Sequence, residues 1–185
     1  TGRGPDLGRV VEWGSGGGAN AVHFAPRATE FVSVDVSTEN LDECARQTAA
    51  VCDTPVVSVR IDVGDPEAAL DTIGTGSVDT FLCVYVIELL PSPAYVERIL
   101  AITRDLLTDD GVAFLQFRYQ TRRWSSRATR RNYRRNLALT TVFPIDEFWE
   151  ATRRAGLEPE ALHLVPKTAL DERYGYLVCT RAGGH

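Results

Sequence analysis

Short apolar runs alternate with segments of helical periodicity along most of the chain. Five of these runs predict strands, and they cover residues 9–12, 31–36, 56–61, 78–86 and 112–117. The run VDTFLCVYV at 78–86 is almost entirely apolar, as expected for a central parallel strand covered on both faces. Strands separated by helices in this way predict an α/β fold with a Rossmann-like, doubly wound parallel sheet.

Capping residues mark the ends of the helices between these strands. Ser37 or Thr38 can cap a helix that runs to about Val51, and Ser92 followed by Pro93 begins another that runs to about Leu107. The remaining signals predict a helix over 19–24, a short helix after Asp65-Pro66, a turn at Asp110-Gly111, and a helix from Pro144 or Asp146 to Gly156.

The last two apolar runs, residues 162–165 and 174–180, are separated by about eight residues with no helical pattern. Such a short connection predicts an antiparallel hairpin, because a parallel pair needs a longer crossover. The expected sheet therefore has seven strands, is mostly parallel, and ends in a C-terminal antiparallel hairpin.

Length and composition fit a single domain that spans residues 1–185. No apolar run approaches the roughly 18 residues of a membrane-spanning helix. The four cysteines form no C-x-x-C pair, so they predict small buried residues in a reducing cytoplasm and no zinc site. The chain contains no methionine, and Thr1 is therefore interpreted as a processed or trimmed start.

The glycine-rich turn VVEWGSGGG follows directly on the first predicted strand. In a doubly wound sheet, ligands bind beyond the carboxyl ends of the strands, and Gly14, Gly16 and Gly18 would let the backbone approach such a ligand closely. Asp35 ends the second strand, 21 residues after Gly14, where a carboxylate can accept hydrogen bonds from both hydroxyls of a ribose. The alternative is that Asp35 caps the next helix.

Glu12 distinguishes between the nucleotide-like ligands that such a turn can bind. The glycines also satisfy a dinucleotide fingerprint, but a carboxylate two residues before Gly14 would repel a pyrophosphate and would attract an ammonium group. After the third strand, Asp62 could accept a hydrogen bond from an adenine amine while Val63 packs on the ring. The alternative for Asp62 is a simple exposed loop acid.

Four segments, VVEWGSGGG, FVSVDVS, IDV and VDTFLCVYVIELL, stand just past successive strands over residues 9–117. Their order resembles that of the motifs of class I S-adenosylmethionine-dependent methyltransferases, in the small-molecule branch. The resemblance implies S-adenosylmethionine as cofactor, S-adenosylhomocysteine as its product, and no metal. By position it implies a cofactor site made of Glu12, Trp13, Gly14, Gly16, Gly18, Asp35, Val36, Asp62, Val63, Cys83 and Val84.

Trp13 departs from the family pattern, which has a small or aliphatic residue at this place. We interpret the ring as packing beneath the following helix, with a substrate contact as the alternative.

The resemblance also implies where the acceptor lies, because the end of the fourth strand flanks the transferring methyl group in the family. Methyl transfer is an in-line displacement that depends on alignment and on exclusion of water, and a base is needed only when the acceptor loses a proton. Tyr85, Glu88 and Tyr119 are the expected catalytic residues. The expected activity is methylation of a small molecule, at a hydroxyl oxygen of a sugar or natural product.

Residues 118–135 contain eight arginines and no acid, although the net charge of the chain is −5, which leaves −13 on the remainder. The segment 118–143 is expected to be a lid or insertion over the acceptor site. Its arginines could pair with acids of the same chain, bind an anionic or glycosylated acceptor, or bind nucleic acid. An RNA methyltransferase and a non-catalytic adenosylmethionine-binding module are therefore the alternative functions.

Overall fold

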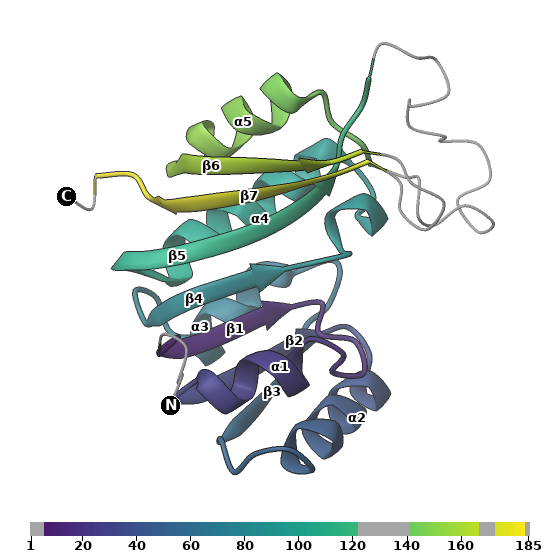
Figure 1. Cartoon of the computed structure of the whole chain (residues 1–185), viewed down its shortest axis with the longest axis vertical. Coiled ribbons are helices and arrows are strands. Elements are labelled where there is room, and N and C mark those ends of the chain that lie inside the picture. The colour runs from purple at the N-terminus through teal and green to yellow at the C-terminus, as the bar shows by residue number, and fades with distance from the viewer. Residues whose placement is uncertain (1–5, 122–140, 167–172, 184–185) are drawn as a thin grey trace.

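A computed structural model describes residues 6–121, 141–166 and 173–183, and within them the chain forms a seven-stranded sheet (Figure 1). The strand order is β3-β2-β1-β4-β5-β7-β6. The strands are β1 (Arg9–Trp13), β2 (Glu30–Asp35), β3 (Val56–Arg60), β4 (Val78–Cys83), β5 (Leu107–Arg118), β6 (Leu157–Val165) and β7 (Tyr174–Arg181). The first five strands run parallel, and β7 lies antiparallel between β5 and β6. The predicted fold class is confirmed.

Five α-helices connect the strands of the described residues, together with short 3₁₀ turns. Ser37 and Ser92 cap the two longest helices, since each hydroxyl accepts a hydrogen bond from the backbone N–H three residues later at 3.2 Å. Asp65 makes no such cap, and Pro66 begins a 3₁₀ turn. The helices are α1 (Ala21–Phe24), α2 (Thr38–Ala49), α3 (Ala69–Ile73), α4 (Pro93–Leu106) and α5 (Ile145–Arg154).

Several strand boundaries differ from the sequence prediction, and both β5 and β6 begin five residues earlier than expected. β4 ends at Cys83, three residues early, because the backbone leaves the sheet at Tyr85 with a φ of +59°. The turn predicted at Asp110-Gly111 is wrong, since both residues lie within β5 at a register shift against β4. A Cβ at Gly111 would stand 2.8 Å from the Val78 carbonyl oxygen, so the glycine permits close strand approach instead of a turn.

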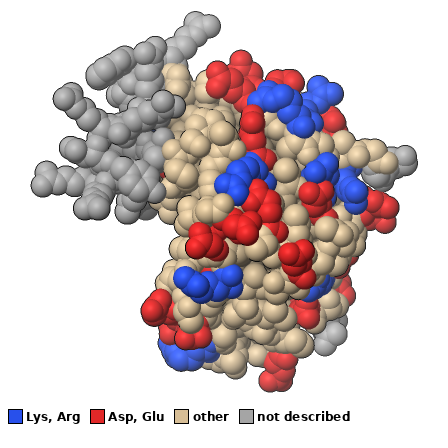
Figure 2. Space-filling view, turned by 180° about the vertical axis from the view of Figure 1, so that it is seen from behind, with Lys and Arg blue, Asp and Glu red and all other residues tan. Residues whose placement is uncertain are grey.

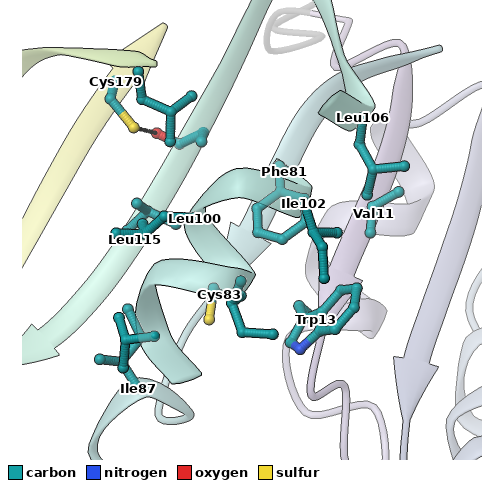
Figure 3. Packing of buried hydrophobic residues seen from close by; sticks show 14 of the residues in the cluster. Val11, Trp13, Phe81, Cys83, Ile87, Leu100, Ile102, Leu106, Leu115 and Cys179 are labelled. Atoms are coloured by element: carbon teal, nitrogen blue, oxygen red, sulfur yellow. Dashed lines mark hydrogen bonds between the residues drawn. The ribbon is translucent and has the colours of Figure 1, made fainter. Parts of the chain in front are cut away.

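Helices cover the sheet on two faces, and each face has its own apolar cluster (Figure 1). α1 and α2 pack on one face over Val10, Phe31 and Leu82. The other face carries the larger cluster, shown in Figure 3, in which Val11 of β1 and Phe81 of β4 pack with residues of α4 such as Ile102. This alternation along β1 places consecutive residues on opposite faces, so Glu12 points towards α1 and Trp13 towards α4.

Charges of both signs are interspersed on the face of the molecule that Figure 2 shows. Several of them form ion pairs, such as Arg98 with Glu67 and Arg154 with Glu97. Of the segment 118–143, residues 122–140 lie outside the described residues. Arg118 itself belongs to β5 and has a buried side chain. No helix of the described part is long and apolar enough to cross a membrane.

The parallel strands bring their carboxyl ends to one edge of the sheet. β2 and β3 lie on one side of β1 in the sheet, and β4 and β5 lie on the other side. The strand order therefore reverses between β1 and β4. A crevice opens at such a point in doubly wound sheets, because the two connections run away from each other. The glycine-rich turn after β1 lies at this crevice.

Candidate functional site

A pocket of about 600 Å³ lies at the reversal point, over the carboxyl ends of β1 to β4. The described residues that line it come from the ends of these strands, from the loops that follow them, and from the starts of α2 and α4. They are Trp13, Gly14, Ser15, Gly16, Gly17, Ala19, Asn20, Asp35, Val36, Asn40, Ile61, Val63, Val84, Tyr85, Val86, Leu89, Leu90, Pro91 and Tyr95. Eight of the predicted site residues, from Trp13 to Tyr85, are thus brought together.

The glycine turn forms one wall of the pocket. Gly14 and Gly16 both have positive φ, of +74° and +51°. A Cβ at Gly14 would stand 2.3 Å from Cγ2 of Val86, whereas a Cβ at Gly16 would meet no atom within 4 Å. Gly14 is therefore required for packing against the loop after β4, and Gly16 leaves open a space on the pocket side of the turn.

Asp35 is buried at the end of β2 and joins the glycine turn to the start of α2. Its Oδ2 accepts a hydrogen bond from the Gly16 N–H at 3.0 Å, and its Oδ1 accepts from Ser37 N and from Asn40 Nδ2 at 2.9 and 3.1 Å. Ser37, and not Asp35, caps the helix. These bonds fix the carboxylate in the pocket wall. Oδ1 already accepts two hydrogen bonds and Oδ2 accepts one, so Oδ2 retains acceptor capacity for a ligand hydroxyl.

Glu12 lies one layer behind the pocket, with a side chain that is only 1% exposed. Its Oε1 accepts a hydrogen bond from Asn20 Nδ2 at 2.8 Å, and Asn20 itself lines the pocket. Oε2 is buried and has no hydrogen-bond partner among the described residues. Burial raises the pKa of Glu12 to about 7, with the Asn20 hydrogen bond acting in the opposite direction and the Asp35 charge adding to the rise.

Gly18 does not line the pocket, although the sequence places it in the same turn. Its φ is +90°, and a Cβ there would stand 3.0 Å from the Cα of Cys44 in α2. The glycine therefore allows α2 to pack closely against the turn.

Replacing Gly18 by alanine is expected to lower the free energy of unfolding by about 1–3 kcal/mol, because the backbone is left-handed and Cys44 offers main chain, not a flexible side-chain end. Urea unfolding measures this loss. Affinity for S-adenosylhomocysteine should fall less than tenfold in the folded fraction. A stable variant that has lost the ligand would assign Gly18 to the pocket instead.

The loop after β3 brings Val63 to the pocket but not Asp62. Val63 is half-exposed and lines the pocket beside Ile61. Asp62 is exposed, and its Oδ1 accepts a hydrogen bond from the Gly64 N–H at 2.6 Å within the loop. In this structure Asp62 has the geometry of a loop acid that shapes its own turn.

Trp13 forms part of the pocket wall and part of the core at the same time. Its side chain is 2% exposed, and its ring lies 6.3 Å from that of Phe81 (Figure 3). The ring therefore packs on the face that carries α4, and one part of the residue borders the pocket. The interpretation that it packs beneath the following helix is wrong, because α1 covers the opposite face of the sheet.

The predicted catalytic residues occupy different places. Tyr85 lines the pocket and is 48% exposed. Glu88 is buried outside it, where burial raises the pKa of its carboxyl and the Tyr174 hydroxyl donates a hydrogen bond to it. Tyr119 is also buried and forms a bridge with Phe143, away from the pocket lining.

Cys83 is fully buried at the end of β4 and does not reach the pocket, whereas Val84 does. Burial raises the pKa of the Cys83 thiol well above its usual range. A neutral thiol in this position packs as a small apolar side chain.

Sequence reasoning did not identify about half of the pocket lining. Ser15, Asn20 and Asn40 are polar members of this group. The structure shows that Asn20 and Asn40 donate hydrogen bonds to Glu12 and Asp35, the two acids that the sequence did single out. The apolar members carry no signal beyond their place after β4; they include Val86, Leu89, Leu90 and Pro91. Within the described residues, no cluster of three or more His, Cys, Asp and Glu side chains could hold a metal ion.

Solved structures that share this fold at low sequence identity include three methyltransferases. The 1,6-didemethyltoxoflavin-N1-methyltransferase of Burkholderia thailandensis is 18% identical with a TM-score of 0.71, and the match covers 94% of this chain and 71% of that one. A TehB-like SAM-dependent methyltransferase of Corynebacterium glutamicum is 18% identical with a TM-score of 0.65, covering 96% and 82%. The arsenic(III) S-adenosylmethionine methyltransferase of Chlamydomonas reinhardtii is 14% identical with a TM-score of 0.68, covering 97% and 65%.

At the sequence level, none of the curated proteins matches the chain. The family model described as "Methyltransferase domain" does match it, over residues 11–113. That region is more than half of the chain and runs from β1 into β5, so it contains every loop that contributes to the pocket. The chain belongs to the methyltransferase-domain family, in its class I S-adenosylmethionine-dependent form, and S-adenosylmethionine is its methyl donor.

Proposed function

We propose that the chain methylates a small molecule, at a hydroxyl oxygen of a sugar or natural product. The observation that carries the proposal is the pocket itself, which is about 600 Å³ in volume and has the half-exposed Tyr85 in its lining. A concave site of this size suits a cofactor and a small ligand. The nucleic-acid alternative depends on arginines that, apart from the buried Arg118, lie outside the described residues.

The residues present fit S-adenosylmethionine. The buried Oε2 of Glu12, which lacks a partner among the described residues, suits the ammonium group of the methionine end. The space beside Gly16 and the carboxylate of Asp35 suit a ribose whose hydroxyls donate to that carboxylate. Val36 and Val63, both half-exposed in the pocket, suit the faces of the adenine ring.

When bound, S-adenosylmethionine supplies a methyl group on a positively charged sulfur. The side chains of the chain would act by orientation and by exclusion of water, which the apolar wall of Val86, Leu89 and Leu90 favours. Tyr85 would border the acceptor. Glu88, whose pKa is raised by burial, would accept the hydroxyl proton through Tyr174, to which it is hydrogen-bonded.

Calorimetry with S-adenosylhomocysteine and with NAD tests the cofactor part of the proposal. Transfer of a labelled methyl group to sugars, hydroxylated natural products and RNA then tests the acceptor. We expect binding of S-adenosylhomocysteine alone and transfer to small hydroxylated molecules. Transfer to RNA only would replace the proposal, and binding without any transfer would indicate a non-catalytic module.

The affinity for S-adenosylhomocysteine is expected to depend on pH through Glu12. The pKa of Glu12 is raised to about 7, and an ammonium group binds the carboxylate form, so affinity should fall by up to about tenfold per pH unit below pH 7. In the ligand-free protein, the contribution of Glu12 to folding stability changes with pH in the opposite direction to the ligand affinity. A folded-state pKa above 4.5 stabilises the fold at low pH, and this contribution is lost as pH rises towards 7.

Calorimetry between pH 5.5 and 8.5 checks this dependence, with Glu12→Gln as the matched control. The glutamine keeps an oxygen for Asn20 but cannot ionise, so its affinity should be low and flat across the range. A wild-type profile that is equally flat would contradict the role given to Glu12.

A further inference from the structure

Tyr85 has a backbone conformation that its residue type rarely adopts. Its φ is +59°, and among the described residues only Arg173 shares a positive φ without being glycine. Bulky side chains are strained in this region and remain there only where the surroundings determine the conformation. Strain of this kind at the end of β4, in the wall of the pocket, requires a structural cause.

Gln116 of β5 supplies that cause. Its side chain is fully buried, and its Oε1 accepts a hydrogen bond from the Tyr85 N–H at 2.5 Å. Its Nε2 donates to the Tyr176 hydroxyl at 3.3 Å, and Tyr176 is the residue paired with Gln116 in the register of β5 and β7. Both ends of the amide are thus engaged, which fixes its orientation and the position of the Tyr85 backbone.

The Tyr85 ring is held as well as its backbone. It meets the Tyr174 ring edge-on, with centroids 5.2 Å apart and an interplanar angle of 84°. The Tyr174 hydroxyl is in turn hydrogen-bonded to buried Glu88, and burial raises the pKa of Tyr174 to about 12. A T-shaped contact covers at most one face of the Tyr85 ring, so the other face remains for other contacts, in agreement with its 48% exposure.

The charges in the pocket lining limit which groups can stack on the open face of the Tyr85 ring. Among the described residues that line the pocket, Asp35 has the only carboxylate, and none is a lysine or an arginine. The residues closest to Tyr85 in sequence, Val84 and Val86, are apolar. An immobile, half-exposed aromatic ring between such neighbours favours a flat uncharged group that stacks on it.

We propose that the acceptor is a planar aromatic or heteroaromatic molecule that lies on the Tyr85 ring, and that Gln116 is the positioning residue that holds this ring in place. The inference rests on the proposed function and narrows its acceptor class. Preorganisation by Gln116 means that the ring loses little conformational freedom when the acceptor binds, so the stacking contact contributes fully to affinity.

Binding of 2-naphthol and of decahydro-2-naphthol to protein saturated with S-adenosylhomocysteine tests the acceptor class. The two probes have the same carbon framework and hydroxyl, and only 2-naphthol is planar. We expect calorimetry to give at least tenfold tighter binding of 2-naphthol. Equal binding of the two, or no binding of either, would overturn the inference.

Substitutions of Tyr85 and Gln116 test the roles of the two residues. Tyr85→Phe keeps the ring and should retain the preference, whereas Tyr85→Leu should weaken 2-naphthol binding about tenfold. Gln116→Met removes the hydrogen bond at similar size and should have the same effect. The double variant should bind no more weakly than Tyr85→Leu alone, because both changes remove the same interaction, which is stacking on a correctly placed Tyr85 ring.

The variants test the role of Tyr85 and the role of Gln116 separately. Undiminished binding in Tyr85→Leu would overturn the stacking role, and additive losses in the double variant would overturn the positioning role of Gln116. Should Gln116→Met fail to unfold cooperatively, the Phe and Leu variants of Tyr85 still decide the acceptor class. Failure of the wild type to bind S-adenosylhomocysteine contradicts the proposed function, whereas its binding without a preference for 2-naphthol contradicts this inference alone.

Discussion

Replacement of Asp35 by alanine is expected to abolish measurable binding of S-adenosylhomocysteine. The carboxylate is buried, is held by Gly16, Ser37 and Asn40, and faces the pocket with remaining acceptor capacity. Hydrogen bonds to a charged group contribute about 1.5–3 kcal/mol each. Loss of a ribose contact, together with release of Gly16 and Asn40, which also line the pocket, corresponds to a reduction in affinity of about 100-fold or more. Isothermal titration calorimetry measures the effect.

Asp79→Ala is the matched control for this substitution. Asp79 also accepts a hydrogen bond from a backbone N–H, that of Arg9 at 2.7 Å, but it lies at the opposite end of β1 and outside the pocket. Both variants should lose some stability, and only Asp35→Ala should lose the ligand. Near-normal affinity in Asp35→Ala would exclude this carboxylate from cofactor binding.

A second large effect is expected when leucine replaces Gly16. A side chain at this position would enter the open space of the pocket, where a Cβ meets no atom within 4 Å. The protein should fold, with a backbone strain of about 1–2 kcal/mol from the left-handed φ, while binding of S-adenosylhomocysteine falls below detection.

Gly76 offers an unusually close control for Gly16. Its φ is +61°, a Cβ there also meets nothing within 4 Å, and it lies before β4, away from the pocket. Gly76→Leu should therefore show the same shift in urea midpoint with unchanged ligand affinity. If both leucine variants bind the ligand normally, the pocket beside Gly16 is not the cofactor site.

The fold class could be predicted from the sequence, because each strand and helix follows from a local pattern of apolar and capping residues. The apolar run before Gly14 and the run ending at Asp35 each predict a strand whose end lies at the ligand edge, and the structure has both. The short connection before Tyr174 correctly predicted the antiparallel edge. The roles of Glu12 and Asp35 in binding stay predictions, although their positions around the pocket agree with them.

The parts that sequence reasoning missed depend on contacts between distant segments. Gly18 looks like its neighbours in the turn, but its environment is set by Cys44 of α2. Tyr85 could not be recognised as left-handed, because the acceptor of its N–H is Gln116, 31 residues away. Asp110-Gly111 has the composition of a turn. The glycine lies inside a strand because the Val78 carbonyl oxygen of the neighbouring strand leaves no room for a Cβ.

Trp13 belongs to two environments, and this has an evolutionary consequence. Its ring packs against Phe81 in the core, while the same residue borders the pocket. A mutation that repacks the core around this ring must also reshape the ligand site, and a mutation that adapts the site must be accommodated by the core. A substitution of Trp13 that changes ligand preference therefore also lowers the stability of the fold. Such a substitution is tolerated only after mutations elsewhere have stabilised the core.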